Sequence, residues 1–338
     1  MIVILGSGRS GTSFLAKLFD SHPAVLYRHE PDSVFKDPEL PANPPADVPD
    51  EVAERAGRYL RDLVAVRHPK TAVLPFFPKA YRGPVRQWLH QGTAFVHKTL
   101  ARPSLSWLAD RLRIPDLIDP GRRGGIVPVI KSVDSLCRAQ AFVRADPAVR
   151  VVHILRHPCG VIASRLRGVK KGLMQKNTGL RLVFSLPVTE TYGITPEEME
   201  AAADEERMAL QWMAINDKVW RELEGHPQYS AVIYEKLCLD TEGETRRLFD
   251  FAGLDYHDAT ARFIGELGSQ AGGRPGYFSI MRPPRSALEV WKKDLTPEQV
   301  GRIRAIVSRG TVSRFFPDLV GEEGAAGPGV AEAVEARD

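Results

Sequence analysis

A glycine-rich stretch near the start of the chain combines a guanidinium and several hydroxyls in a short loop. Residues 6–13 read Gly-Ser-Gly-Arg-Ser-Gly-Thr-Ser and lie between an apolar run, Ile2 to Leu5, and a segment with helical apolar spacing from Phe14 to Phe19. This order predicts strand, loop and helix. Backbone N–H groups and the positive end of the helix would then converge on an anion, with phosphate or sulfate as the natural ligand.

Two common nucleotide-binding loops fit this stretch poorly. An ATP-type loop, G-x-x-x-x-G-K-[ST], needs lysine where this chain has Thr12, so a metal-dependent nucleoside triphosphate site loses its usual cation. A dinucleotide fingerprint matches Gly6, Gly8 and Gly11 by spacing alone. The acidic residue expected about 20 positions later falls near Glu30, which is not clearly at a strand end. A plain glycine turn between strand and helix is the remaining alternative.

The elements that must position this loop read as strands alternating with helices. Each predicted strand is short, apolar and rich in β-branched residues, and each helical pattern follows or precedes one of them. Such alternation predicts an α/β fold, a P-loop-like three-layer α/β/α arrangement with a central, mainly parallel sheet and ligands at the carboxyl ends of the strands. Besides residues 2–5, the predicted strands are Val25–Tyr27, Ile126–Ile130, Val151–Leu155 and Ala231–Tyr234, and the clearest helices are Asp134–Ala145, Pro196–Leu223 and Thr245–Gly253.

Five segments together resemble one family. The sequence is similar, over about residues 1 to 315, to sulfotransferases that use 3′-phosphoadenosine 5′-phosphosulfate (PAPS), in the arginine-loop form of carbohydrate and tyrosylprotein sulfotransferases. Each motif alone is modest, but their order and spacing are specific. They are Arg9-Ser10-Gly11-Thr12-Ser13, Leu155-Arg156-His157-Pro158 with Ser164, Tyr234-Glu235-Lys236-Leu237, the helix Arg246–Leu254, and Pro284-Arg285-Ser286 with Trp291.

The resemblance implies PAPS as the cofactor and adenosine 3′,5′-bisphosphate (PAP) as its product. The loop would hold the 5′-phosphosulfate, Arg156 and Ser164 would hold the 3′-phosphate, and the carboxy-terminal motif would close over the nucleotide. No metal is implied. The cofactor-binding residues implied in this way are Arg9, Ser10, Gly11, Thr12, Ser13, Arg156, Ser164, Tyr234, Arg285 and Ser286.

Three residues carry the predicted chemistry. Glu30 follows the second strand, and a carboxylate beside a phosphosulfate needs a purpose, which abstraction of a hydroxyl proton supplies. The resemblance implies the same role as base. Arg9 and Lys131 would stabilise charge in transfer; Lys131 follows a buried strand and precedes Arg156 by the 25 residues typical of the family.

Each of these roles has an alternative. His29 is the second candidate for the base, and Lys98 competes with Lys131. Lys131 could also be a solvated strand cap. Glu30 could form an ion pair with Arg28 or Arg9, which does not exclude catalysis.

Two further features of the sequence have less specific interpretations. The span from Arg165 to Thr189 has six basic and no acidic residues up to Arg181, and is a solvated face, a wall for an anionic acceptor or a lid over the cofactor. Cys159 is interpreted as a small buried residue because no acid-base partner is identifiable beside it. The three cysteines show no C-x-x-C spacing, so neither a disulfide framework nor a zinc site is predicted.

Composition limits the remaining possibilities. The chain has 338 residues, 43% hydrophobic and 26% charged, with a net charge of +4 that is too small to predict nucleic acid as a partner. No apolar run reaches the roughly 18 residues of a membrane span, and a strand begins at the first residues, so we expect a cytoplasmic protein without membrane contact. We predict a sulfotransferase domain over residues 1–320, with the proline-rich residues 36–49 as a surface excursion, and a disordered tail over 321–338.

The predicted function is sulfuryl transfer from PAPS to a hydroxyl of a saccharide or small-molecule metabolite, by in-line attack. The acceptor and the oligomeric state are not specified by any motif. Two alternatives stay open: a P-loop kinase that acts on a small molecule and requires magnesium and a nucleoside triphosphate, and a non-enzymatic nucleotide-binding regulator.

Overall fold

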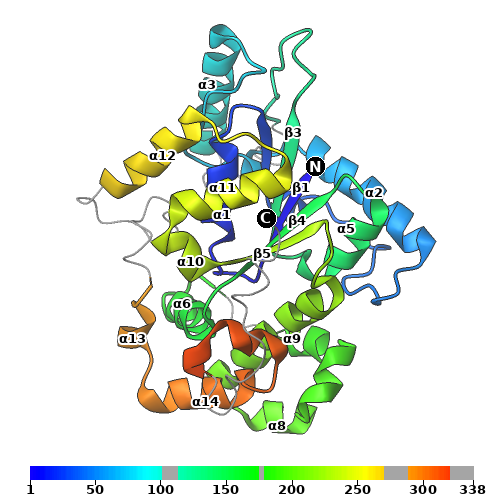
Figure 1. Ribbon diagram of the computed structural model, residues 1–338, viewed down its shortest axis with the longest axis vertical. Coiled ribbons are helices and arrows are strands. Elements are labelled where there is room, and N and C mark those ends of the chain that lie inside the picture. Colours follow the sequence, from blue (N-terminus) through cyan, green and yellow to red (C-terminus); the bar gives the residue numbers. More distant parts are fainter. Residues whose placement is uncertain (101–112, 175–178, 270–287, 320–338) are drawn as a thin grey trace, which may run out of the picture. The chain divides into compact units, whose positions relative to one another are not determined.

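The computed structural model describes residues 1–100, 113–174, 179–269 and 288–319 (Figure 1). Their contacts group into two compact units, which we describe separately. The first takes Met1–Arg156 and Glu222–Leu288, and the second takes His157–Arg221 and the residues from Glu289 onward. The single domain over 1–320 stays a prediction, and the predicted tail lies outside the described residues.

A five-stranded parallel sheet forms the centre of the first unit, in the order β2-β3-β1-β4-β5. This confirms the predicted α/β fold with a parallel sheet. The prediction of a strand over 231–234 was wrong at its end, because Tyr234 already begins a helix that buries Leu237 and Cys238. The strands are β1 Ile2–Leu5, β2 Val25–His29, β3 Val127–Ser132, β4 Arg150–Leu155 and β5 Tyr229–Ile233.

The strand order brings the candidate residues to one edge of the sheet. Because all five strands are parallel, their carboxyl ends meet at the same edge, and each is followed by a predicted site segment or contains a predicted site residue near its end. β1 lies between β3 and β4, with Ile4 paired to Lys131 on one side and to Val152 on the other. The chain reverses its direction of strand addition at β1, which is where α/β sheets bind ligands.

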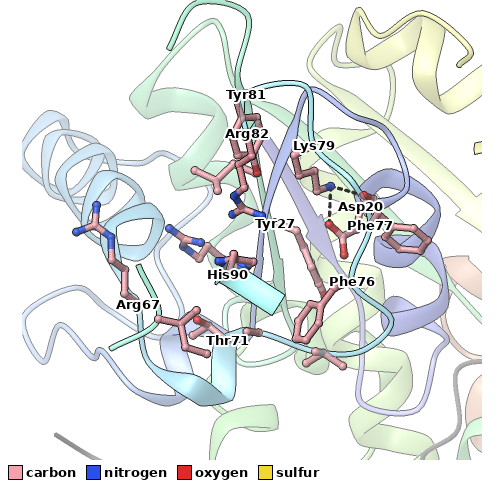
Figure 2. Close-up of a pocket in the computed structure, with 15 residues that line it drawn as sticks. Asp20, Tyr27, Arg67, Thr71, Phe76, Phe77, Lys79, Tyr81, Arg82 and His90 are labelled. Carbon is pink, nitrogen blue, oxygen red and sulfur yellow. Dashed lines mark hydrogen bonds and ion pairs between the residues drawn. The ribbon is translucent and has the colours of Figure 1, made fainter. Parts of the chain in front are cut away.

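The outer edge of β2 is covered by the chain between residues 69 and 82 (Figure 2). Lys79 pairs with Asp20 at 2.9 Å, and the N–H of Ala80 donates to the carbonyl of Pro23 at 3.0 Å. Covering an edge strand removes a site of unwanted pairing. Helix α3, Pro84–Leu100, follows this segment and was not predicted from the sequence.

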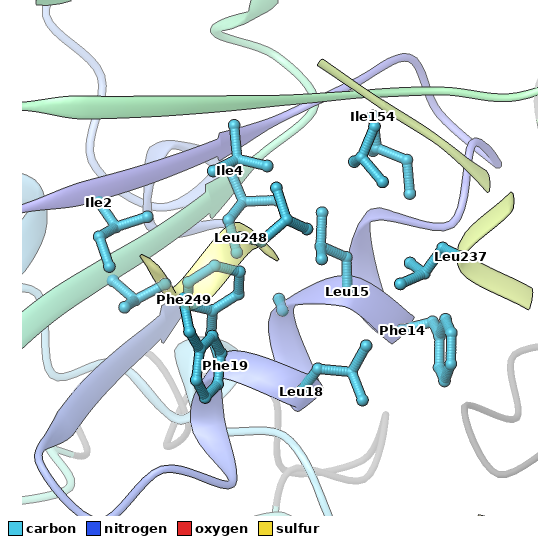
Figure 3. Close-up of a cluster of buried hydrophobic side chains, with 14 of the residues drawn as sticks. Ile2, Ile4, Phe14, Leu15, Leu18, Phe19, Ile154, Leu237, Leu248 and Phe249 are labelled. Atoms are coloured by element: carbon cyan, nitrogen blue, oxygen red, sulfur yellow. The ribbon is translucent and has the colours of Figure 1, made fainter. Parts of the chain in front are cut away.

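Helices cover both faces of the sheet and complete the three layers. On one face, alternate strand residues such as Ile2, Ile4 and Ile154 join a buried apolar cluster with Leu15 and Phe249 (Figure 3). On the other face, α2 and α5 pack against each other and reach β3 and β4. The cluster face carries α1 Thr12–Asp20, α10 Tyr234–Leu239, α11 Thr241–Ala252 and α12 Asp258–Ser269, whereas α2 is Asp50–Ala65 and α5 is Ala139–Ala145.

The second unit is helical and is held together around α9. The predicted helix over 196–223 is two helices, because Ala202 is extended and the Glu206 carboxylate accepts from the N–H of Ala203 at 2.8 Å. Asp217 is fully buried and accepts from the N–H of Val312 at 2.7 Å. The helices are α6 Pro158–Lys170, α7 Leu180–Val183, α8 Pro196–Ala201, α9 Asp204–Leu223, α13 Trp291–Asp294 and α14 Pro297–Val307.

Two predictions about helices are refined by these bounds. The predicted helix over 134–145 is a 3₁₀ turn at Leu136–Arg138 followed by α5, and the predicted helix over 245–253 begins earlier, at Thr241. Asp240 caps the latter by accepting from the N–H of Gly243 at 2.9 Å. Among the helices of the described ranges, none is both long and apolar enough to cross a bilayer.

Candidate active site

The loop after β1 has spare polar groups that an anion would use. Arg9 and Gly11 have left-handed backbone conformations, with φ of 74° and 97°. The hydroxyl oxygens of Ser7 and Ser10 are buried and lack a hydrogen-bond partner in the described structure. Gly11 precedes α1 without a side-chain cap, so the first N–H groups of the helix face no competing acceptor of that kind. A buried unpaired polar group costs about 1–3 kcal/mol, so the loop fits a bound anion.

Tyr234 and Arg156 pack on this loop from the ends of β5 and β4. A Cβ added to Gly11 would lie 2.3 Å from the ring of Tyr234, so a side chain at this position would displace the ring. The Arg156 guanidinium carbon lies 4.5 Å from the centre of the same ring, and its Nη1 donates to the carbonyl of Arg9 at 3.0 Å. Three predicted cofactor-binding residues, Arg9, Arg156 and Tyr234, are therefore neighbours.

Glu30 and Lys131 form an ion pair between the ends of β2 and β3. The N–H of Glu30 also donates to the carbonyl of Lys131 at 2.8 Å. The Lys131 side chain is 3% exposed and that of Glu30 is 32% exposed. Lys131 is therefore not a solvated strand cap, and the partner of Glu30 is neither Arg28 nor Arg9 but Lys131.

Burial and the ion pair act on both groups of this pair. Burial raises the pKa of Glu30, but the attraction of Lys131 and its hydrogen bond outweigh burial, and the pKa lies below its usual range. Burial lowers the pKa of Lys131, and the nearby Glu30, Asp32 and Asp134 oppose that effect. The carboxylate of Glu30 is therefore ionised at neutral pH, as a general base must be.

His29, the second candidate for the base, is held by β2 itself. Its Nδ1 lies 2.8 Å from the hydroxyl of Tyr27, and its Nε2 lies 4.0 Å from the Glu30 carboxylate. The charge of His29 also lowers the pKa of Glu30. Both candidate bases thus lie next to each other, with Glu30 the one in contact with Lys131.

A buried network that the sequence did not reveal fixes the turn after Glu30. Asp32 is 3% exposed, and its carboxylate accepts from the hydroxyls of Ser132 and Ser135, the latter at 2.7 Å. Burial raises the pKa of Asp32. This network ties the turn after β2 to the turn after β3 and so keeps Glu30 beside Lys131. Its only sequence signal was two serines close to Lys131, which is too common to be informative.

Arg28, also at the end of β2, is a structural residue. Its Nη2 donates to both oxygens of Asp116, at 2.8 and 2.9 Å. Lys98, the competitor of Lys131, lies in α3.

The remaining predicted residues belong to the second unit or lie outside the described structure. Ser164 is buried in the second turn of α6, 4% exposed. In the basic span, Arg165 donates to Gln211 and Arg167 pairs with Asp294, each at 2.7 Å, so these two are bound within their own unit. Arg285 and Ser286 lie outside the described residues.

At the start of α6, His157 makes a stacking contact with an aromatic ring, and Cys159 is an unreactive buried residue. His157 stacks on Trp291 with ring centres 4.9 Å apart and lies 3.0 Å from the Asp318 carboxylate. Cys159 is fully buried, and burial raises the pKa of its thiol to about 12. This agrees with the prediction that Cys159 is a packing residue.

The residues present fit a ligand that carries an anionic group. The loop offers buried hydroxyls, N–H groups at a helix start and the cation of Arg9, while Arg156 and Lys131 add two more cations at the same sheet edge. Among the residues that the structure describes, Glu30 supplies the carboxylate in contact with Lys131. Anion binding, charge stabilisation and proton abstraction are thus available from neighbouring strand ends.

Known proteins with similar sequences and folds were found over most of the chain. Residues 2–258 match the sequence model of a family described as "Sulfotransferase family". The chain is 24% identical to carbohydrate sulfotransferase 7 of Rattus norvegicus over 355 residues, which cover 90% of this chain and 71% of the relative. Carbohydrate sulfotransferase 2 of Mus musculus is 26% identical over 181 residues, which cover 47% and 33% respectively.

Solved structures give weaker likenesses. The sulfotransferase domain from the curacin biosynthetic pathway has a TM-score of 0.43 and 16% identity, and covers 91% of this chain and 97% of that one. Mouse sulfotransferase SULT7A1 complexed with PAP has a TM-score of 0.43 and 12% identity, with 94% and 88% covered.

Proposed function

The chain belongs to the sulfotransferase family, and from that premise we propose that it transfers a sulfuryl group from PAPS to a hydroxyl of a saccharide. PAPS, when bound, supplies the activated sulfuryl group. The loop from Gly6 to Ser13 would hold the 5′ end of the donor through N–H groups and hydroxyls. Arg156, with Ser164, would hold the 3′-phosphate, and Tyr234 would line the nucleotide site.

Glu30 takes the proton of the acceptor hydroxyl in this proposal. The hydroxyl oxygen becomes a better nucleophile as its proton moves to the carboxylate. Lys131 and Arg9 stabilise the negative charge that moves during transfer, as preorganised cations in a site with little water do. The Glu30–Lys131 contact has to loosen when Lys131 turns to the donor, which frees the carboxylate for the proton.

One observation carries the proposal: Lys131 is a nearly buried ammonium whose hydrogen-bond acceptor among the described residues is Glu30 alone. A purely structural lysine of this burial would have its other two protons bonded as well. The pair lies at strand ends beside the anion-binding loop. This arrangement supports the proposed roles of Glu30 as base and Lys131 as charge stabiliser.

A saccharide is proposed as the acceptor because of the relatives. Two of them are named carbohydrate sulfotransferases, and one is matched over 90% of this chain. The described residues around Glu30 and Lys131 carry no feature that identifies the chemical class of the acceptor.

The test combines binding with transfer. With the purified full chain, PAP should raise the melting temperature more than adenosine 5′-monophosphate does, because only PAP carries the 3′-phosphate. Arg156→Ala should remove the difference through the loss of a charge-assisted contact of about 1.5–3 kcal/mol. Arg150→Ala, at the opposite end of β4, is the matched control and should keep it. Equal shifts for the two nucleotides in the native protein would contradict the donor assignment.

Transfer is measured with ³⁵S-labelled PAPS and a panel of oligosaccharides. We expect label in a saccharide without added magnesium or ATP. Phosphate transfer from Mg-ATP to the same acceptors would indicate the kinase alternative. Tight PAP binding with no labelled acceptor in a whole-cell extract would indicate the regulator.

A further inference from the structure

A second polar site lies along the outer edge of β2, away from the loop. It is a pocket walled by aromatic rings, among them Tyr27, Phe76 and Phe77, and by basic side chains. Figure 2 shows Arg82 and His90 pointing toward one another inside it. No step of the proposed reaction uses this pocket.

Positive charge exceeds negative charge around the pocket. Asp20 is shared by Lys17 and Lys79, at 2.6 and 2.9 Å. Asp116 is shared by Arg28 and Arg67, at 2.8 and 3.2 Å, and its backbone carbonyl accepts from Arg82. Two carboxylates therefore pair with four cations, and the fifth cation, Arg82, bonds a backbone carbonyl. The excess is concentrated in a nearly buried place, where solvent screens it little.

Arg82 is a nearly buried cation that bonds no carboxylate among the described residues. It is 8% exposed, its Nε donates to the Asp116 carbonyl at 2.6 Å, and its guanidinium lies 5.0 Å from the ring of Tyr81. Its two terminal nitrogens have no acceptor among the described residues. Arg28, by contrast, uses Nη2 on both Asp116 oxygens. Burial lowers the pKa of Arg82, and a guanidinium that is buried with free donors lacks the compensation that burial of a charge requires.

The pocket is the size of one small group. Its cavity volume is about 50 Å³, whereas a cavity of about 150 Å³ holds a benzene ring. A carboxylate or a sulfate fits this volume, and the rest of a larger ligand would stay outside. A planar anion also suits the two terminal nitrogens of a guanidinium.

The pocket shares a strand with the proposed base. Tyr27 lines the pocket and its hydroxyl contacts His29, which lies beside Glu30. Two to three residues of strand separate the pocket wall from Glu30, or roughly 7–10 Å. A ligand anchored in the pocket by one end can therefore present a hydroxyl near Glu30 with its other end.

We propose that this pocket binds an anionic group of the acceptor, a carboxylate or sulfate about 7–10 Å from the hydroxyl that receives the sulfuryl group. Arg82 is the specificity-determining residue, and the aromatic walls exclude water from the contact. The inference rests on the proposed function, since it names the chemical class of the acceptor: an acidic saccharide.

The first experiment tests the anion site without any turnover. Melting temperatures are measured at saturating PAP, which occupies the donor site, with sodium sulfate against sodium chloride at equal ionic strength. We expect a saturable sulfate-specific increase in the native protein that Arg82→Gln removes. Arg86→Gln is the control, because Arg86 lies outside the pocket and is bonded to Ile118 and Asp119. Sulfate stabilises proteins in general, so an equal increase in all three proteins would overturn the anion site.

The second experiment separates a free anion from a group of the acceptor. A uronic-acid disaccharide and its methyl ester are compared for kcat/KM and, independently, for Kd by calorimetry. We expect the acid to be favoured at least about tenfold and Arg82→Gln to lose that preference while PAP affinity is kept. A sulfate effect with equal values for acid and ester would overturn the acceptor assignment and leave a separate anion site.

The two proposals fail in different ways. Preferential binding of the acid without any sulfation would contradict the proposed function and keep the pocket. Sulfation with no preference for the acid in the native protein would contradict the pocket alone. If Arg82→Gln does not fold, Arg67→Gln decides, since Arg67 lines the pocket with a side chain that is 52% exposed. We then expect a partial loss of the preference, and an unchanged preference would overturn the inference.

Discussion

Two buried lysine–carboxylate clusters of the first unit are built in opposite ways. Lys17 donates to the Asp20 carboxylate at 2.6 Å and to the carbonyls of Val73 and Pro75 at 2.5 and 2.9 Å. Its three protons are thus all bonded. Lys131 is equally buried but is bonded to Glu30 alone among the described residues. The carboxylates differ too, because the Asp20 side chain is 9% exposed and that of Glu30 is 32% exposed.

The difference shows how a structural charge cluster can be told from a reactive one. A buried ammonium that is fully bonded repays the cost of its burial and holds two segments together, here α1 and the chain from 69 to 82. A buried ammonium with free protons, beside a partly exposed carboxylate, keeps donors in reserve for a ligand. Burial alone would have put both lysines in one class.

The largest expected effect is on turnover, and it follows from a change in the cluster of Lys131 and Glu30, which we call the reactive cluster. Glu30→Gln keeps the size of the side chain and removes its basicity, so turnover should fall by about 10²- to 10⁴-fold, as for a general base. Folding and PAP affinity should persist, and PAP binding could tighten because a negative charge is removed. The measurement is single-turnover transfer at saturating acceptor, together with PAP titration.

His29→Ala is the companion variant and should reduce turnover much less. Near-normal turnover of Glu30→Gln, where chemistry limits the rate, would move the base to His29. A strong loss in both variants would indicate that the two residues act as one unit, connected through the contact between His29 and Glu30.

The next largest effect is on stability, and it follows from a change in the cluster of Lys17 and Asp20, which we call the structural cluster. Lys17→Met leaves Asp20 with one cation and two carbonyls without their donor, so the free energy of unfolding should fall by about 3–5 kcal/mol. Lys131→Met leaves a partly exposed carboxylate and should cost about 1 kcal/mol or less, while abolishing transfer. Urea unfolding and the transfer assay, run on both variants, compare the clusters directly. Equal losses of stability would show that counting bonded protons does not separate them.

Much of this architecture could be predicted from the sequence because its signals are local. The strand that becomes β1 and the helix that becomes α1 follow from apolar runs around a glycine-rich loop, and the order of strands and helices predicts the parallel sheet. Glu30, Lys131 and Arg156 were placed at strand ends by the same argument, and Arg9 in the loop after the first strand. The end of β5 was misplaced because the apolar run continues into a helix whose inner face is equally apolar.

The pairings across the chain could not be predicted. Lys131 meets Glu30 over a separation of 101 residues, and Asp32 meets Ser135 over 103. Nothing in either local sequence distinguishes these partners from Arg28 or Arg9. The pocket beside β2 could not be predicted for the same reason. Arg82 is left without a carboxylate partner because Arg28 and Arg67, both distant in sequence from Asp116, share that carboxylate.

A smaller effect on turnover is expected at the hydrogen-bond network of Asp32, which holds the turns on which Glu30 and Lys131 lie. Asp32→Asn removes the charge that two serine hydroxyls donate to, so the turns after β2 and β3 should lose their fixed distance. We expect kcat to fall by about tenfold with KM for PAPS little changed, which corresponds to about 1.4 kcal/mol. Asp134→Asn, exposed and two residues beyond Ser132, is the control. A loss of PAP affinity equal to the loss of kcat would show general unfolding of the site and not misplacement of Glu30.

The smallest effect is on the pH dependence of folding stability, and it involves His90, which lines the pocket beside β2. The Nδ1–H of His90 donates to the carbonyl of Pro115 at 2.9 Å. Burial, together with the charge of Arg82, lowers the pKa of His90 to about 4. The unfolded chain has its imidazole pKa near 6.5, so between about pH 6.5 and 4 the unfolded state binds more protons and stability falls as the pH falls. Because His90 is partly exposed, we expect a loss of about 1 kcal/mol at pH 5 relative to pH 7.

His90→Asn, which can still donate to Pro115, should reduce this loss in urea unfolding. Glu30 and Asp20 both have pKa values below their usual range in the folded protein, so the stability that they contribute is lost only as the pH falls below about 5, toward their unfolded pKa values near 4. Burial also lowers the pKa of His22, so part of the pH dependence should remain in His90→Asn. A pH dependence of undiminished size in that variant would locate the titrating group elsewhere and remove the link between this pocket and acid sensitivity.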